Sequence, residues 1–129
     1  MTHLVDSDWV ADWLKGKLEV AEFLASLGRG NLAISLVTYG EIFEGVYFGP
    51  DPRRHENVFG QFLRGIPVLP LNRPIMRRFA RLRGELRRRG DLIGDLDLLI
   101  AATALYYDLT LITGNLRHFS RIPNLKTHR

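Results

Sequence analysis

The sequence predicts an α/β domain built on a short, mostly parallel sheet. Short apolar segments typical of buried strands alternate with longer segments of helical periodicity nearly throughout the chain. A chain of 129 residues has room for one ordinary core, so we expect residues 1–129 to form a single domain. In such a sheet the ligand site lies beyond the carboxyl ends of the strands, and this rule selects the residues to consider for function.

The first half of the chain alternates twice between strand-like and helical segments. The apolar segment HLV ends at Asp6 and is followed by the helical segment WVADWL. Gly28 and Gly30 end the next helical segment, and the proline-rich turn at 49–52 separates two further helices. The elements expected here are strands at 3–5 and 32–35 and helices at 9–14, 18–27, 37–48 and 53–65.

The second half continues the alternation. Two prolines in PVLPL indicate a short strand or an edge strand. The helix that follows is predicted by apolar residues at helical spacing with arginines between them, and Gly90 ends it. The elements expected here are strands at 67–71, 109–113 and 123–127 and helices at 73–90 and 96–107.

Composition narrows the classes of function. No apolar run is long enough to span a bilayer, and the first residues lack the pattern of a secretory signal, so we expect a cytoplasmic protein without a membrane partner. Cysteine is absent, which excludes thiolate metal sites and leaves oxygen or histidine ligands. Eight of the fifteen arginines lie between Arg73 and Arg89, a bias that favours a polyanion or an acidic partner, although a solvated helix face gives the same pattern.

Several carboxylates follow strand-like segments. Asp6 ends the first, Glu41 lies early in the helix after the second, and Asp95 and Asp97 begin the helix that leads into LTLIT. Each has an ordinary explanation as a helix cap, and Thr38 with Glu41 forms a capping-box pattern. Together they indicate a metal site, because buried carboxylates repel one another unless a cation neutralises them. An all-oxygen site prefers Mg²⁺ or Mn²⁺, and such a site beside a basic helix fits the hydrolysis of a nucleic acid.

Three segments carry a resemblance to a known family: LVDSDWVADWL, ISLVTYGEIFEGV and GDLDLLIAATALYYDLTLITGNLRHFSRIPNL. In order and spacing they resemble the PIN domain, and specifically the VapC toxins of toxin–antitoxin pairs, over nearly the whole chain. The resemblance implies a three-layer α/β/α sandwich and an endoribonuclease that depends on Mg²⁺ or Mn²⁺. It also implies a homodimer, inhibition by a cognate VapB-type antitoxin, and an RNA substrate such as tRNA or rRNA.

The resemblance assigns roles to residues of this sequence. It implies that Asp6, Glu41 and Asp97 are the catalytic, metal-binding acids, and it makes Asp95 an auxiliary ligand or a cap. Many relatives carry a fourth acid near the end of the last major strand, where this chain has Asn115 and then His118. This departure puts a second metal ion in doubt. The remaining assignments are Asp8 and Asn115 as auxiliary ligands and Ser7 and Thr113 as residues that orient the ligands. Separately, the arginine-rich helix offers Arg77, Arg81 and Arg88 as contacts to RNA or antitoxin, with a solvated helix face as the alternative.

Two other functions remain open from the sequence. Asp6 and Asp8 match the D-x-D-x-V nucleophile motif of haloacid-dehalogenase-like phosphatases. Those enzymes also need a lysine between their two acidic motifs, and the chain offers only Lys15, Lys17 and Lys126. The second alternative is a PIN-like module that binds RNA or a protein without catalysis, for which the missing fourth acid would be a sign of decay.

Overall fold

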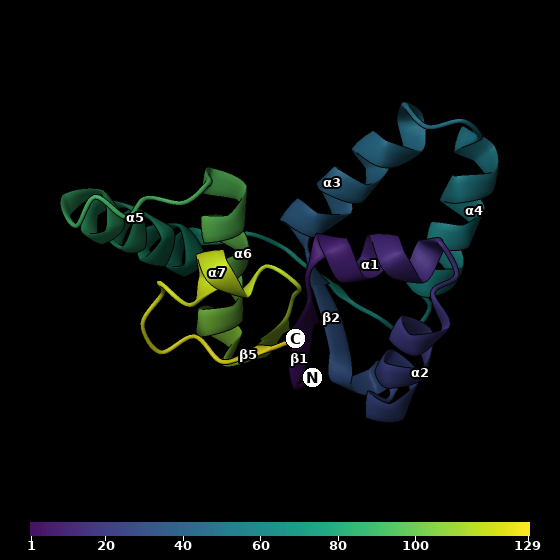
Figure 1. Cartoon of the computed structure of the whole chain (residues 1–129), viewed down its shortest axis with the longest axis horizontal. Helices are drawn as coiled ribbons and strands as arrows, with labels where there is room; N and C mark the ends of the chain where they lie inside the picture. Colours follow the sequence, from purple (N-terminus) through teal and green to yellow (C-terminus); the bar gives the residue numbers. More distant parts are fainter.

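The computed structural model describes residues 1–129 and contains one five-stranded sheet in the order β3-β2-β1-β4-β5 (Figure 1). Every neighbouring pair of strands is parallel. The first strand of the chain therefore lies at the centre, between the second and the fourth. The strands are β1 (His3–Val5), β2 (Leu32–Ser35), β3 (Val68–Leu69), β4 (Thr110–Ile112) and β5 (Thr127–His128).

Helices cover both faces of the sheet, and Figure 1 shows three layers with the sheet in the middle. The helices on one side are α1 (Ser7–Leu14), α2 (Leu18–Leu27), α3 (Leu36–Tyr47) and α4 (Pro52–Phe62). Those on the other side are α5 (Arg73–Arg88), α6 (Asp95–Tyr107) and the short α7 (Leu116–Phe119). The predicted three-layer α/β/α sandwich is confirmed.

The two faces of the sheet bury separate apolar clusters. Successive strand residues point to opposite faces, so Leu4 lies in a cluster of 14 buried residues and Val5 in a second cluster of 12. Leu111 and Ile112 divide between the same two clusters. Helix α6 is apolar on nearly all sides because it lies between the sheet and α5, and Leu98 and Ile100 are fully buried there. None of the helices is both long and apolar enough to cross a membrane.

Most of the predicted elements are present with small shifts of their ends, and three predictions need correction. The last strand was expected at 123–127 but lies at Thr127–His128, where β5 pairs with β4. Helix α7 and the 3-10 helix η1 (Arg29–Asn31) were not predicted, because each is too short to show a periodic pattern. The capping box was also wrong: α3 begins at Leu36, and its cap is the Ser35 hydroxyl, which accepts a hydrogen bond from the Val37 amide at 3.0 Å.

Candidate active site

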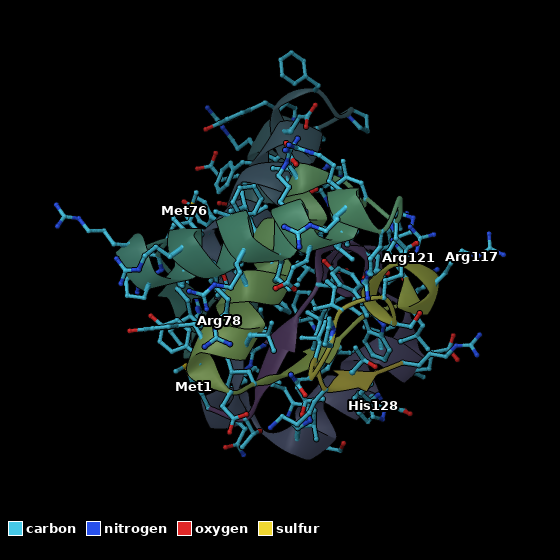
Figure 2. All side chains as sticks on the ribbon, turned by 90° about the vertical axis from the view of Figure 1, so that its left-hand side faces the viewer. Met1, Met76, Arg78, Arg117, Arg121 and His128 are labelled. Atoms are coloured by element: carbon cyan, nitrogen blue, oxygen red, sulfur yellow. The ribbon has the colours of Figure 1, made fainter.

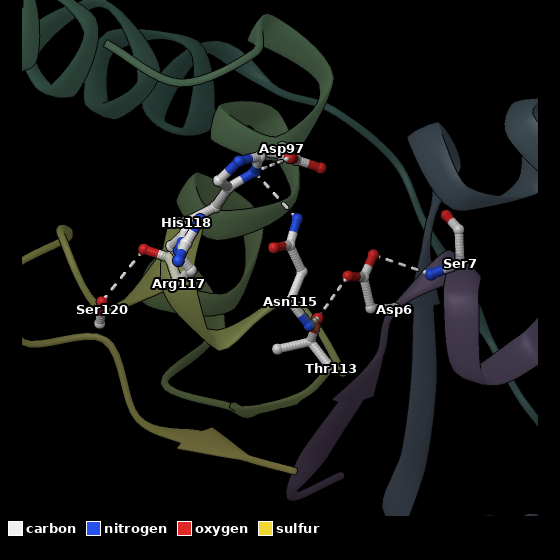
Figure 3. Close-up of polar contacts among 8 residues, drawn as sticks. All are labelled: Asp6, Ser7, Asp97, Thr113, Asn115, Arg117, His118 and Ser120. Atoms are coloured by element: carbon white, nitrogen blue, oxygen red, sulfur yellow. Dashed lines mark hydrogen bonds and ion pairs between the residues drawn. The ribbon is translucent and has the colours of Figure 1, made fainter. Parts of the chain in front are cut away.

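Asp6 is a buried carboxylate at the carboxyl end of the central strand. Its side chain is only 6% exposed, and both oxygens accept hydrogen bonds (Figure 3). The Ser7 amide donates to Oδ1 at 2.7 Å, and the Thr113 hydroxyl donates to Oδ2 at 2.7 Å. Thr113 directly follows β4, so the two neighbouring central strands together fix the orientation of this carboxylate. Asp6 caps α1, which is the ordinary explanation that the sequence allowed, and the contact of its second oxygen with Thr113 lies outside this cap.

Ser7 connects the start of α1 to α3. Its hydroxyl donates to Glu41 Oε1 at 2.6 Å and lies 3.2 Å from the hydroxyl of the fully buried Thr38. Glu41 lies one turn and a half into α3 because Ser35 begins that helix, so no capping function explains this carboxylate. Instead it is directed across to the residue that follows Asp6. The strand-end rule therefore correctly brought Asp6 and Glu41 to one edge of the sheet.

Asp97 faces His118 and Asn115. Its Oδ2 lies 3.2 Å from His118 Nδ1, and the same ring nitrogen lies 2.9 Å from Asn115 Nδ2 (Figure 3). His118 Nδ1 serves one of these neighbours at a time: it donates to the carboxylate when it carries a proton, and it accepts from the amide when it does not. Asp97 lies in the first turn of α6, whose cap is Gly94, so it is free of a capping role.

Two further acids have partners outside this group. Asp8 Oδ1 accepts from the Trp9 amide and Oδ2 from the Gly114 amide, each at 2.8 Å. Asp8 therefore ties the start of α1 to the turn after β4. Asp95, in the first turn of α6, pairs with Arg83 at 2.8 Å on the exposed side of the helix. The geometry makes Asp95 a surface ion-pair residue.

The electrostatics of the site follow from burial. Loss of water around Asp6 raises its pKa from 3.8 to about 6, although the hydrogen bond from Thr113 opposes this shift. The negative charges of Asp8 and Asp97 raise the pKa of Asp6 further, which shows that both lie within electrostatic range. Desolvation also raises the pKa of Asp8 above its usual value. Asp6 is therefore a buried carboxylate whose negative charge is disfavoured by burial and by the neighbouring Asp8 and Asp97, and a cation would relieve that repulsion.

The donor set fits a hard divalent cation in its chemistry. Asp6, Glu41 and Asp97 supply carboxylates, Ser7 and Thr113 supply hydroxyl groups, and His118 supplies the one imidazole. In the conformations present, no three acidic or histidine side chains are close enough to share one ion. Glu41 contacts Ser7 and Asp97 contacts His118, so a cation shared by these acids would require their side chains to rotate.

Two of the predicted arginines lie apart from the acids. Arg77 and Arg81 line a cavity beside Leu105, near the opposite end of α6 from Asp97. Arg88 lies outside that cavity, in the last turn of α5. Arg83 instead pairs with Asp95 in the first turn of α6.

Comparison with known proteins identifies the family. The sequence pattern of the PIN domain matches residues 4–125. The chain belongs to the PIN-domain family. Within it the chain groups with the VapC ribonucleases: ribonuclease VapC2 of Rickettsia felis is 33% identical over 103 residues, which are 79% of this chain and 77% of that protein. The tRNA(fMet)-specific endonuclease VapC of Shigella flexneri is 32% identical over 127 residues, covering 98% of this chain and 96% of that one.

Solved structures agree with this PIN-domain assignment. A chain in the crystal structure of VapBC2 from Rickettsia felis, bound to a DNA fragment from their promoter, superposes with a TM-score of 0.92 at 27% identity. The superposition covers 99% of this chain and 98% of that chain. The PIN fold replaces the phosphatase interpretation of Asp6 and Asp8, since both oxygens of Asp8 are bound to backbone amides of the domain.

Sequence reasoning missed two parts of this PIN-domain site. Thr38 was interpreted as a cap, but it is fully buried against Ser7. Gly114 donates its amide to Asp8, and a Cβ at this position would lie 2.9 Å from Asp8 Oδ2. A glycine between Thr113 and Asn115 was the available signal, because glycine often marks a close approach of the backbone to another group.

Proposed function

We propose that this protein is a metal-dependent endoribonuclease toxin of the VapC type, which hydrolyses RNA phosphodiester bonds with an activated water. One observation carries the proposal: the buried Asp6, with a pKa raised to about 6, lies within electrostatic range of Asp97 and Asp8 and is joined through Ser7 to Glu41. The names of the VapC relatives, which are ribonucleases and endonucleases, support the substrate class.

Asp6, Glu41 and Asp97 are the residues that would hold Mg²⁺ or Mn²⁺. A divalent cation there would lower the pKa of water and neutralise charge on the phosphate. Thr113 holds the second oxygen of Asp6 and so fixes which face of that carboxylate is available. Ser7 holds Glu41 in the same way. His118, when its Nδ1 carries a proton, would orient Asp97, and Asn115 contacts the same ring nitrogen; these two residues stand where many relatives carry a fourth acid.

The proposal extends to partners. The structural neighbours include complexes described as VapBC, so we propose that a VapB-type antitoxin binds and inhibits this chain. We further propose that the protein forms a homodimer and acts in the cytoplasm, where its RNA substrate is found. Since one relative is named for tRNA(fMet), tRNA is the first substrate to test, with rRNA as the second.

The test is cleavage of a pool of tRNA and rRNA by antitoxin-free protein, in Mg²⁺, in Mn²⁺ and in EDTA. Asp97→Asn should lower the rate more than about a hundredfold, since it removes a ligand and not merely a neighbour of one. Asp95→Asn is the matched control, because it makes the same change two residues away on a side chain that pairs with Arg83. It should retain the wild-type rate.

The outcomes separate the functions. Discrete fragments that require metal and disappear only in Asp97→Asn support the nuclease. Equal losses of cleavage rate in Asp97→Asn and Asp95→Asn would mean that cleavage depends on the structure of the first turn of α6 and not on a metal ligand at Asp97. If folded, metal-loaded protein binds RNA but does not cut it, the result would favour the non-catalytic binding module. That module is the second candidate because Asn115 and His118 stand where many relatives carry a fourth acid.

A further inference from the structure

An open cavity of about 340 Å³ lies between helix α5 and the loop before β5. Arg77, Arg78 and Arg81 form the α5 side of this cavity, Leu105 of α6 contributes to its wall, and Asn124 lies opposite in the loop. All three arginines are exposed. Figure 2 faces α5 and shows Arg78 directed toward the viewer's side of the molecule, away from the sheet.

The positive charge of this cavity exceeds the negative charge in its wall. None of the structure's ion pairs involves Arg77, Arg78 or Arg81, and the only acid in the wall is Glu85. Arg77 and Arg81 are also four residues apart on one helix, a spacing at which like charges destabilise the helix by a few tenths of a kcal/mol. Three arginines that line one cavity beside a single carboxylate, and that form no ion pair, are suited to bind an anion.

The cavity lies at a distance from the acidic site. Asp97 is in the first turn of α6 and Leu105 is in its last turn. Eight residues of α-helix correspond to about 12 Å along the axis. A phosphate bound in the cavity is therefore a different phosphate from the one that would be cleaved at Asp6 and Asp97. A ligand that occupies both places must carry several anionic groups along its length.

We propose that the arginine cavity binds phosphate groups of the RNA at a distance from the bond that is cut, and so contributes affinity for long or folded RNA. This inference rests on the proposed function for the identity of the polyanion. Arginine forks match phosphate oxygens in two-point hydrogen bonds. The wall offers few apolar side chains to anchor a protein segment, only Leu82 and Leu105 beside two prolines, which favours a nucleic-acid backbone over an acidic peptide.

The experiment measures RNA binding separately from cleavage. Fluorescently labelled total tRNA is titrated with Asp97→Asn protein over a range of KCl concentrations, with and without the double substitution Arg77→Gln/Arg81→Gln. The control is Arg53→Gln/Arg54→Gln, which removes the same charge from two exposed arginines of α4 on the opposite layer. Unlabelled poly-L-glutamate serves as a competitor, to test an acidic polypeptide in place of RNA.

Loss of two phosphate contacts should make the plot of log affinity against log salt less steep by about 1.4 for single-stranded RNA or about 1.8 for a duplex. We expect this change for Arg77→Gln/Arg81→Gln and not for the control. Equal changes in both, or no change in either, would overturn the inference. So would competition by poly-L-glutamate as strong as that by tRNA at equal charge. Cleavage by the wild-type protein is assayed in parallel, so its absence would count against the nuclease and leave the binding result intact.

Discussion

Replacing Asp6 with asparagine should stabilise the metal-free protein at neutral pH. The carboxyl group has a pKa of about 6 in the folded protein and 3.8 when unperturbed. The difference of roughly two pKa units, at about 1.36 kcal/mol each, amounts to about 3 kcal/mol. Asparagine keeps the pattern of hydrogen bonds, since its oxygen can accept from the Ser7 amide and its amide can donate to the Thr113 hydroxyl.

The sign follows from proton linkage. Because the folded protein binds the Asp6 proton more tightly than the unfolded chain does, ionisation of Asp6 opposes folding. This penalty is absent below about pH 4, grows as the pH rises from 4 to 6, and is complete above pH 6. The variant should therefore match the wild type near pH 4 and exceed its free energy of unfolding by about 3 kcal/mol at pH 7.

Urea unfolding in EDTA at several pH values between 4 and 8 measures this difference. Asp12→Asn is the control, because Asp12 is on the same helix and makes only a partly exposed ion pair with Lys17, worth up to about 1 kcal/mol. A difference between wild type and Asp6→Asn that stays constant with pH would refute the reasoning. Addition of Mg²⁺ or Mn²⁺ should then stabilise the wild type more than the variant, because a ligand that binds the folded state raises its stability.

Two further predictions concern the surroundings of Asp6, and a third concerns the apolar core. Gly114→Ala should lower the free energy of unfolding by about 1 kcal/mol, because the new Cβ displaces the Asp8 carboxylate. In protein that already carries Asp8→Ala, the same substitution should leave the free energy of unfolding unchanged, and urea unfolding of the two single variants and the double variant measures this difference. His118→Ala should slow RNA cleavage about 10- to 100-fold with little change in stability, because it removes the partner that orients Asp97; an unchanged rate would show that Asp97 needs no such partner. Phe59→Ala should lower the free energy of unfolding by about 3–5 kcal/mol, since this ring is fully buried, and calorimetry that shows a loss below 1 kcal/mol would contradict the packing described.

The fold could be predicted in order and type because its strands and helices have clear periodicity. The misses have physical causes. Strand β5 is two residues long and is defined by pairing with β4, so its position depends on a neighbour that no local pattern reveals. Helix α7 is four residues long and is held by the buried Phe119, which gives one apolar anchor instead of a repeat.

The candidate site was partly predictable. The strand-end rule brought Asp6 and Glu41 to one edge of the sheet, and the family resemblance identified Thr113. The individual contacts of side chains could not be predicted from the sequence. Spacing along the chain reveals neither the ion pair of Asp95 with Arg83 nor the contact of Asp8 with the Gly114 backbone amide. The metal assignment of Asp6, Glu41 and Asp97 stays a prediction for the experiments above.

The hydrogen bond between Asp6 and Thr113 joins residues 107 positions apart, and it has a consequence for synthesis. At about 5–20 residues per second, a ribosome makes Thr113 roughly five to twenty seconds after Asp6. Strand β1 therefore cannot pair with β4 early in synthesis, and Thr113 cannot fix the Asp6 carboxylate until most of the 129 residues have been translated. A nascent chain thus passes most of its elongation without an assembled site.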